Sequence, residues 1–183
     1  MKKVLLVLSV VLLTACMKNN TDGEKFKLEY EALNDKGIIV EINADANIKY
    51  LELTEVLDLF ENKTGIIYFG FPNCPWCRNI IPILLDVAKD NNEVVYYFNP
   101  REVRGTDDPD FAKLMEILYD YLHSDENGEK VLYVPDVYFI KNGNIVGHHL
   151  GSASTQNNPY EKLTEEQIKE LKEIYINLLN KIK

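Results

Sequence analysis

Hydrophobic residues fall along the chain in short apolar runs separated by longer stretches with helical spacing. The clearest runs cover 65–71 and 93–98. Such runs are typical of strands that are covered on both faces. Between them, apolar residues from 78 to 89 recur at the spacing of a helix, with an expected kink at Pro82. Together these segments predict a β-α-β unit.

The residues before this unit are less regular. Residues 48–53 alternate loosely and predict the first core strand, followed by a helix that Thr54 can cap. Further upstream, 38–42 is rich in β-branched residues and follows a turn signal at 34–37, which favours another strand.

Four more elements are predicted after the unit. Apolar residues from 111 to 122 have helical spacing behind a start signal at Pro109. Two strands, 136–140 and 145–150, flank a tight hairpin turn. A final amphipathic helix opens at Thr164 and runs to residue 182.

The first fifteen residues do not fit this pattern. Lys2 and Lys3 precede an apolar stretch, 4–13, that is too short to span a bilayer as a helix. The combination predicts a secretory signal peptide over 1–15.

The end of that segment resembles the lipobox of bacterial lipoproteins, because Leu-Thr-Ala stands directly before Cys16. The resemblance implies cleavage before Cys16 and a diacylglyceryl group on its sulfur, which anchors a protein without a spanning helix. The alternative is an ordinary signal peptide with a chance cysteine. A polar run follows, so we expect a lipidated flexible tether over 16–27 and one folded domain over 28–183.

Composition narrows the function classes. The chain has 183 residues, 46% of them hydrophobic, which suits one domain with a substantial core. Its formal charge of −9 argues against a nucleic-acid-binding protein and against attraction to anionic lipids. We therefore expect membrane contact through the lipid on Cys16 alone.

If Cys16 carries lipid, the pair Cys74 and Cys77 remains. A structural disulfide closing so small a loop would add little stability. Cys74 lies where a buried strand gives way to a helix, and the first turn of a helix favours a thiolate. Cys77 follows one turn later on the same face. We expect Cys74 to attack a client disulfide and the more buried Cys77 to release the client.

The order of elements from 48 to 182, with the stretch 68–77 (YFGFPNCPWC), resembles the thioredoxin superfamily. It is most similar to membrane-tethered thioredoxin family proteins and bacteriocin transport accessory proteins. The resemblance implies a three-layer α/β sandwich with a mixed central sheet flanked by helices and a helical insertion before a cis-proline. That proline is Pro135, which would face the cysteines and pair with an extended client beside Val134.

Two positions depart from thioredoxins proper, in which a buried aspartate faces a lysine. Tyr68 and Tyr97 stand in the matching places, so we expect the usual proton relay to Cys77 to be absent. Without a buried anion the Cys74 thiolate meets less repulsion, which favours a more oxidising pair. Val134 before the proline resembles periplasmic disulfide oxidases and points the same way.

Other residues are weaker candidates. Trp76 either contacts clients or shields the disulfide, and Arg78 either adds positive potential near Cys74 or is solvated. His148 and His149 are adjacent on a predicted strand and point to opposite faces, so they do not suggest a shared metal ion. We expect neither a metal nor a cofactor.

These patterns predict an extracytoplasmic thiol–disulfide oxidoreductase at the cell membrane, with an unresolved direction and a lean towards oxidation. The expected partners are thiols or disulfides of exported proteins, a membrane redox partner and the membrane itself, with no nucleic acid, and the chain is expected to be a monomer. The alternative is a non-catalytic accessory module of a secretion or bacteriocin export assembly.

Overall fold

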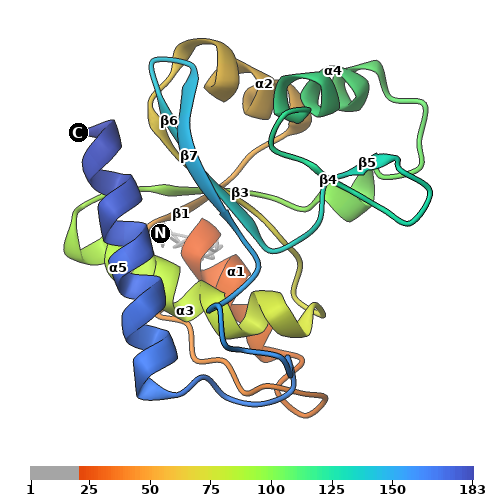
Figure 1. The fold of residues 1–183 in the computed structure, drawn as a ribbon. Helices are drawn as coiled ribbons and strands as arrows, with labels where there is room; N and C mark the ends of the chain where they lie inside the picture. Colours follow the sequence, from red (N-terminus) through yellow and green to blue (C-terminus); the bar gives the residue numbers. More distant parts are fainter. Residues whose placement is uncertain (1–20) are drawn as a thin grey trace, which may run out of the picture.

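The computed structural model describes residues 21–183, in which helices flank one main β-sheet (Figure 1). The helices are α1 (Asp22–Glu31), α2 (Leu53–Asn62), α3 (Pro75–Asp90), the 3₁₀ helix η1 (Pro100–Glu102), α4 (Pro109–Leu118) and α5 (Glu165–Ile182). The strands are β1 (Ile48–Tyr50), β2 (Gly65–Phe69), β3 (Val95–Phe98), β4 (His123–Ser124), β5 (Lys130–Val131), β6 (Asp136–Lys141) and β7 (Asn144–Leu150). The predicted signal peptide over 1–15 and the predicted lipidation site Cys16 lie outside the described residues.

The main sheet has five strands in the order β1-β3-β2-β6-β7. β2 is parallel to β3 and antiparallel to β6, and every residue of β2 is buried. A nearly continuous apolar run suits a central strand covered on both faces. The β2-α3-β3 unit, the antiparallel β6–β7 hairpin and the closing helix α5 confirm the predicted thioredoxin-like α/β fold, including a helix, α4, ahead of Pro135.

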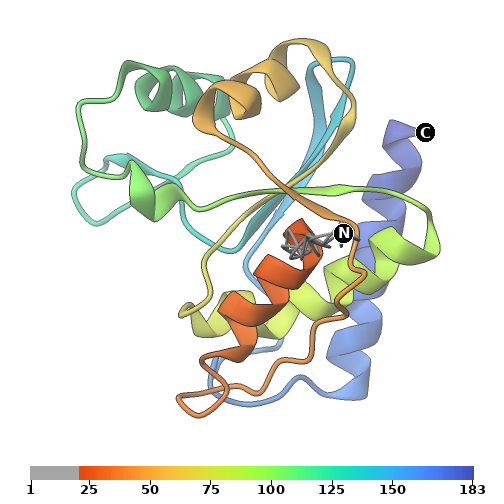
Figure 2. The same ribbon diagram turned by 180° about the vertical axis from the view of Figure 1, so that it is seen from behind.

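The helices form two layers. α1, α3 and α5 cover one face of the sheet, and α2 and α4 cover the other (Figures 1 and 2). Each face has its own buried core: the α1/α3/α5 core includes both Cys74 and Cys77, whereas the α2/α4 core includes neither. The sheet therefore places both cysteines on a single face.

The first helix corrects the predicted domain boundary. We expected a flexible tether over 16–27, but α1 begins at Asp22, with Thr21 and Glu24 forming a capping box. Its residues Phe26 and Tyr30 have no exposed surface. Burial of two aromatic side chains outweighs the polar character of the rest of the helix. The folded domain therefore includes residues 21–27 as well as 28–183.

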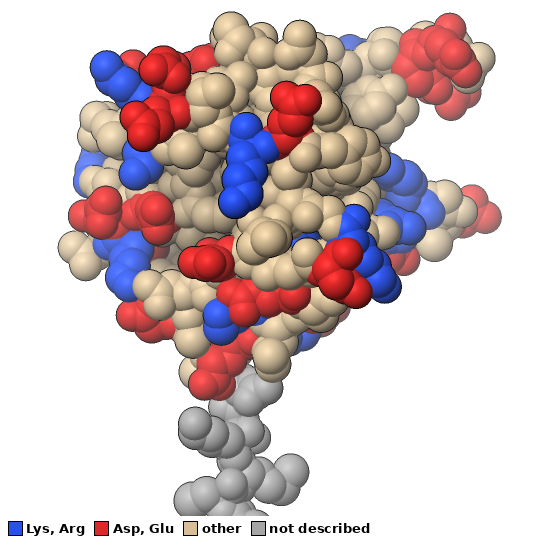
Figure 3. All heavy atoms as spheres, turned by 90° about the horizontal axis from the view of Figure 1, so that it is seen from below, with Lys and Arg blue, Asp and Glu red and all other residues tan. Residues whose placement is uncertain are grey.

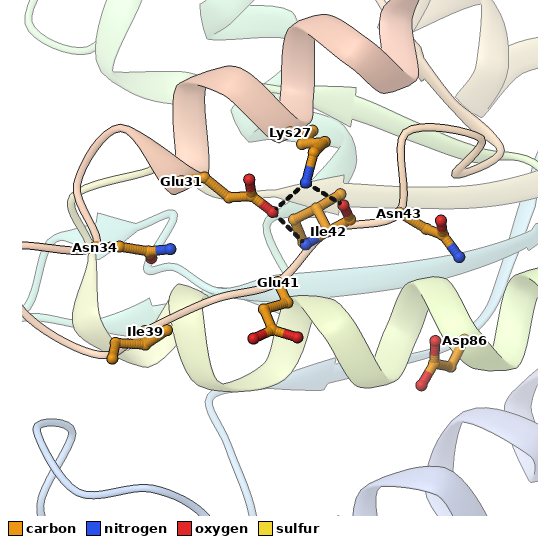
Figure 4. A pocket seen from close by; sticks show the side chains of 8 residues that line it. All are labelled: Lys27, Glu31, Asn34, Ile39, Glu41, Ile42, Asn43 and Asp86. Atoms are coloured by element: carbon orange, nitrogen blue, oxygen red, sulfur yellow. Dashed lines mark hydrogen bonds and ion pairs between the residues drawn. The ribbon is translucent and has the colours of Figure 1, made fainter.

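The strand expected at 38–42 does not form within residues 21–183; Ile38 lies in a bend, and 39–42 have no regular secondary structure and pair with no strand. Side chains from α1 and the turn after it satisfy its backbone instead. Asn34 bonds both backbone groups of Val40 at 2.9 Å. Lys27 donates to the Ile42 carbonyl at 3.0 Å, and Glu31 accepts from the Ile42 N–H at 2.9 Å (Figure 4). A cavity of about 540 Å³ lies beside these contacts and is lined by Lys27, Glu31, Asn34, Ile39, Glu41, Ile42, Asn43 and Asp86 (Figure 4).

Of two other local predictions, the hairpin turn is confirmed, whereas the cap of α2 lies two residues earlier than expected. The predicted hairpin turn is present, with Asn142 and Gly143 at φ of 50° and 77°, as a tight hairpin turn requires. The cap of α2 is Glu52 rather than Thr54.

No helix among the described residues has the length and apolarity needed to cross a membrane. Figure 3 shows acidic and basic side chains interspersed over the described part of one face.

Candidate active site

Cys74 lies where β2 gives way to α3. It is the N-cap of α3, and its sulfur accepts a hydrogen bond from the Cys77 N–H at 3.3 Å. Pro75 follows in the first helical turn, where a missing N–H leaves no helical bond unmade. The sequence prediction of Cys74 at a helix start is confirmed.

The surroundings of Cys74 favour its thiolate. The pKa of Cys74 is lowered, chiefly by hydrogen bonding from the Cys77 side chain and further by the backbone N–H groups of Cys77 and Trp76. Burial opposes this shift, since Cys74 is only 6% exposed. The donors outweigh burial, so Cys74 is the more acidic thiol of the pair.

Cys77 is in a different environment. It lies one helical turn after Cys74 and has no exposed surface. Burial raises the pKa of Cys77, and the neighbouring Cys74 raises it further. Hydrogen bonding from the Tyr68 hydroxyl and from the Phe71 backbone works in the other direction. The two thiols, which are unbonded in the structure, are therefore unequal in the sense that the sequence predicted.

Two tyrosine hydroxyls lie beside Cys77. The Tyr30 and Tyr68 hydroxyls are 2.8 Å apart, and both side chains are fully buried. Burial raises the pKa of each phenol well above its ordinary value, so both stay protonated. Tyr68 was singled out from the sequence only because it stands where thioredoxins proper have a buried aspartate. Tyr30 was not identified from the sequence, because only 16–27 ahead of it was assigned to a tether and no helix was predicted over 22–31.

Gly70 makes room for this pair. A Cβ atom at Gly70 would lie 2.1 Å from the Tyr68 hydroxyl, well inside contact distance. The sequence did carry this signal, because a glycine stands two positions after Tyr68 and so on the same side of the strand.

Arg78 follows Cys77 on α3 and is 4% exposed, so the expectation of a solvated side chain was wrong. Arg78 is not among the groups that shift the pKa of Cys74. Its side chain is buried and donates to the carbonyls of Ile38, Tyr30 and Pro72 at 2.8, 2.7 and 3.0 Å. Arg78 therefore ties α1 and the 38–42 segment to the helix that carries the cysteines.

The loop before β6 faces Cys74. The Val134–Pro135 peptide bond is cis, as the resemblance implied. The Cys74 thiol lies 3.9 Å from the Val134 carbonyl and donates to it. Pro135 is buried, whereas Val134 and Trp76 are partly exposed and pack against the same core. The structure thus brings Cys74, Cys77, Trp76, Val134 and Pro135 together. Cys16 lies outside the described residues.

The two histidines point to opposite faces, as predicted. His148 bonds the buried Asp136 at 3.0 Å and stacks on Tyr138, whereas His149 lies against Tyr175. Burial lowers the pKa of His149. The described residues contain no group of metal-ligating side chains.

An acidic thiol and a buried second thiol one turn away are the parts that thiol–disulfide exchange requires, and here the Val134–Pro135 loop adjoins them. The geometry therefore indicates a thiol redox function.

No family model matches the chain. Among solved structures, thioredoxin O2 from Arabidopsis thaliana in its oxidized state is 18% identical, with 58% of this chain and 84% of that chain covered and a TM-score of 0.39. Thioredoxin O1 from the same plant, also oxidized, is 16% identical over 60% and 89% of the two chains, again with a TM-score of 0.39.

Proposed function

We propose that this protein is a lipid-anchored, extracytoplasmic thiol–disulfide oxidoreductase that acts on exported proteins through Cys74 and Cys77. The observation that carries the proposal is the inequality of the two thiols, since Cys74 is capped by helical N–H groups and Cys77 is buried behind it. A purely structural disulfide has no need for one acidic thiol.

In the reducing direction, the Cys74 thiolate attacks a client disulfide and one client sulfur leaves as a thiolate. Cys77 then attacks the Cys74 sulfur, forms the Cys74–Cys77 disulfide and releases the second client thiol. Oxidation of a client dithiol reverses these steps. The partly exposed Trp76 and Val134 would contact the client, and the Pro135 loop would align it.

A lean towards oxidation follows from the same environment. Stabilising the Cys74 thiolate stabilises the reduced protein, which makes a disulfide a stronger oxidant. No carboxylate within residues 21–183 is among the groups that shift the pKa of either thiol. The pair would be returned to its working state by a membrane redox partner.

Turnover of insulin disulfides with dithiothreitol tests the assignment. We expect Cys74→Ser to abolish the activity and Cys77→Ala to trap disulfide-linked clients, whereas Cys16→Ser keeps the activity in solution. Full activity in Cys74→Ser would refute the assignment as an oxidoreductase and favour a non-catalytic accessory module.

A second experiment tests the lipid anchor. We expect Cys16→Ser to lose both incorporation of labelled palmitate and sedimentation with membranes, and retention of both would disprove the anchor.

A further inference from the structure

Release of a client from Cys74 requires ionisation of a thiol that the fold buries completely. Cys77 has no exposed surface, and burial is the largest cause of its raised pKa. Once a client is bonded to Cys74, that sulfur carries no charge and no longer opposes ionisation of Cys77. The remaining obstacle is burial, which only nearby donors can offset.

The titratable neighbours of Cys77 come from four other elements of the fold. They are Tyr30 on α1, Tyr68 on β2, Tyr97 on β3 and Tyr175 on α5, together with Cys74 on its own helix. The adjacent cation, the guanidinium of Arg78, donates to backbone carbonyls instead. Among the described side chains, Tyr68 is thus the donor that favours the Cys77 thiolate.

We propose that the hydroxyls of Tyr30 and Tyr68 form a neutral donor chain that stabilises the Cys77 thiolate as it attacks a mixed disulfide on Cys74. This inference rests on the proposed redox function. The two hydroxyls are 2.8 Å apart, and either oxygen can be the donor. In the proposed chain Tyr30 would donate to Tyr68, and Tyr68 would turn its own proton towards the Cys77 sulfur, in line with the lowering of the pKa of Cys77 by hydrogen bonding from Tyr68. The Cys77 proton ends on the departing client thiol, so both phenols keep their own protons.

Tyrosines suit this task because they are donors without charge. Both phenols are fully buried, which raises the pKa of each and keeps it neutral. A carboxylate in the same place would repel the thiolate that it had to stabilise. The fold also fixes where the two tyrosines lie. Gly70 leaves the space that the Tyr68 ring fills, and α1 places Tyr30 against it.

The two thiols can be followed separately with 5,5′-dithiobis(2-nitrobenzoate), known as DTNB. In the full chain carrying Cys16→Ser, attack by Cys74 releases one thionitrobenzoate and leaves the other on Cys74. Attack by Cys77 then releases the second and closes the Cys74–Cys77 disulfide, its proton passing to solvent. With equimolar reagent, absorbance at 412 nm shows two phases, and the second is independent of protein concentration.

We expect Tyr68→Phe to slow the second phase about tenfold and to leave the first within about twofold, because one hydrogen bond to a charged sulfur is lost. The pH midpoint of the second phase moves upwards, since the thiolate becomes harder to form. Tyr30→Phe slows the second phase by a smaller factor, about threefold. Adding it to Tyr68→Phe has no further effect, because the chain is already broken.

Tyr175→Phe is the matched control. Tyr175 is fully buried in the same core, and its hydroxyl has no hydrogen-bond partner among the described residues. An unchanged second phase in Tyr68→Phe, or equal slowing in Tyr175→Phe, overturns the donor chain. Absence of a second phase in the Cys16→Ser reference overturns the proposed redox function instead. If circular dichroism shows Tyr68→Phe unfolded, Tyr30→Phe against Tyr175→Phe decides the question.

Discussion

The two faces of the sheet both bury tyrosines, but they give these side chains different neighbours. On the α1/α3/α5 face, Tyr30 and Tyr68 join hydroxyls beside the buried Cys77. On the α2/α4 face, Tyr138 stacks on His148, which bonds the buried carboxylate of Asp136 at 3.0 Å. The acid–imidazole pair of Asp136 and His148 thus lies on the α2/α4 face, away from the cysteines. The neutral hydroxyls of Tyr30 and Tyr68 lie on the α1/α3/α5 face, beside them.

This difference indicates how the fold separates stability from reactivity. A buried charge beside the thiols would control their ionisation. Among residues 21–183, the buried cation on the α1/α3/α5 face is Arg78, which donates to carbonyls and is not among the groups that shift the pKa of either thiol. The Asp136–His148 pair can then stabilise the start of β6, next to Pro135, without acting on the sulfurs. Four predictions test this separation.

The largest effect is expected for Arg78→Ala, which removes the guanidinium donor from two buried carbonyls, those of Ile38 and Tyr30, and from the part-buried carbonyl of Pro72. We expect the free energy of unfolding, measured with urea, to fall by about 3–5 kcal/mol. The control is Arg101→Ala, which removes an exposed side chain bonded to Asn73 and costs less than about 1 kcal/mol. Equal losses in the two variants would mean that Arg78 does not tie the α1 segment to α3.

Next comes Gly70→Ala, whose new methyl group would collide with the Tyr68 ring. Overpacking of this kind costs about 1–3 kcal/mol of unfolding free energy. Gly37→Ala places its methyl group in open space and should leave stability nearly unchanged. We also expect Gly70→Ala to slow the second DTNB phase, and normal stability with normal kinetics would show that the Tyr68 position is not constrained.

A smaller loss, about 1–2 kcal/mol, is expected for His148→Leu, because Asp136 keeps its burial but loses its imidazole partner. Both DTNB phases should stay as they are in the reference protein. A changed rate in either phase would show that the two faces are coupled, contrary to the separation described above.

The smallest intervention is a change of pH alone. Because the pKa of Cys74 is lowered, its thiolate persists below the midpoint of about 8.5 that an ordinary cysteine shows. Alkylation of Cys74 by iodoacetamide, located by mass spectrometry, should therefore reach half its maximal rate below that pH. Cys77→Ala removes the largest cause of the shift and should move the midpoint upwards, whereas an unmoved midpoint would exclude Cys77 as that cause.

Sequence patterns predicted the parts of the fold whose causes are local. The β2-α3-β3 unit and the β6–β7 hairpin follow from apolar runs, helical spacing and turn residues that lie within each segment. The same local signals placed Cys74 at a helix start and Cys77 one turn behind it. The resemblance supplied the cis bond before Pro135.

The features that could not be predicted from the sequence depend on contacts between segments that are distant in the chain. α1 is stabilised by burial of two aromatic residues, Phe26 and Tyr30, in an otherwise polar stretch, so its first part was assigned to the tether over 16–27 and no helix was predicted. Residues 38–42 have the composition of a strand, but Asn34 and α1 side chains replace the neighbouring strand. For the same reason, no local pattern could place Tyr30 beside Tyr68.

The equilibrium reduction potential of the Cys74–Cys77 pair tests the central claim most directly. The full chain with Cys16→Ser would be equilibrated in glutathione buffers, and the disulfide fraction counted after alkylation. A reversible, oxidising pair predicts a potential above the value of about −270 mV typical of thioredoxin. A potential below about −300 mV, the range of inert structural bridges, would contradict the redox assignment.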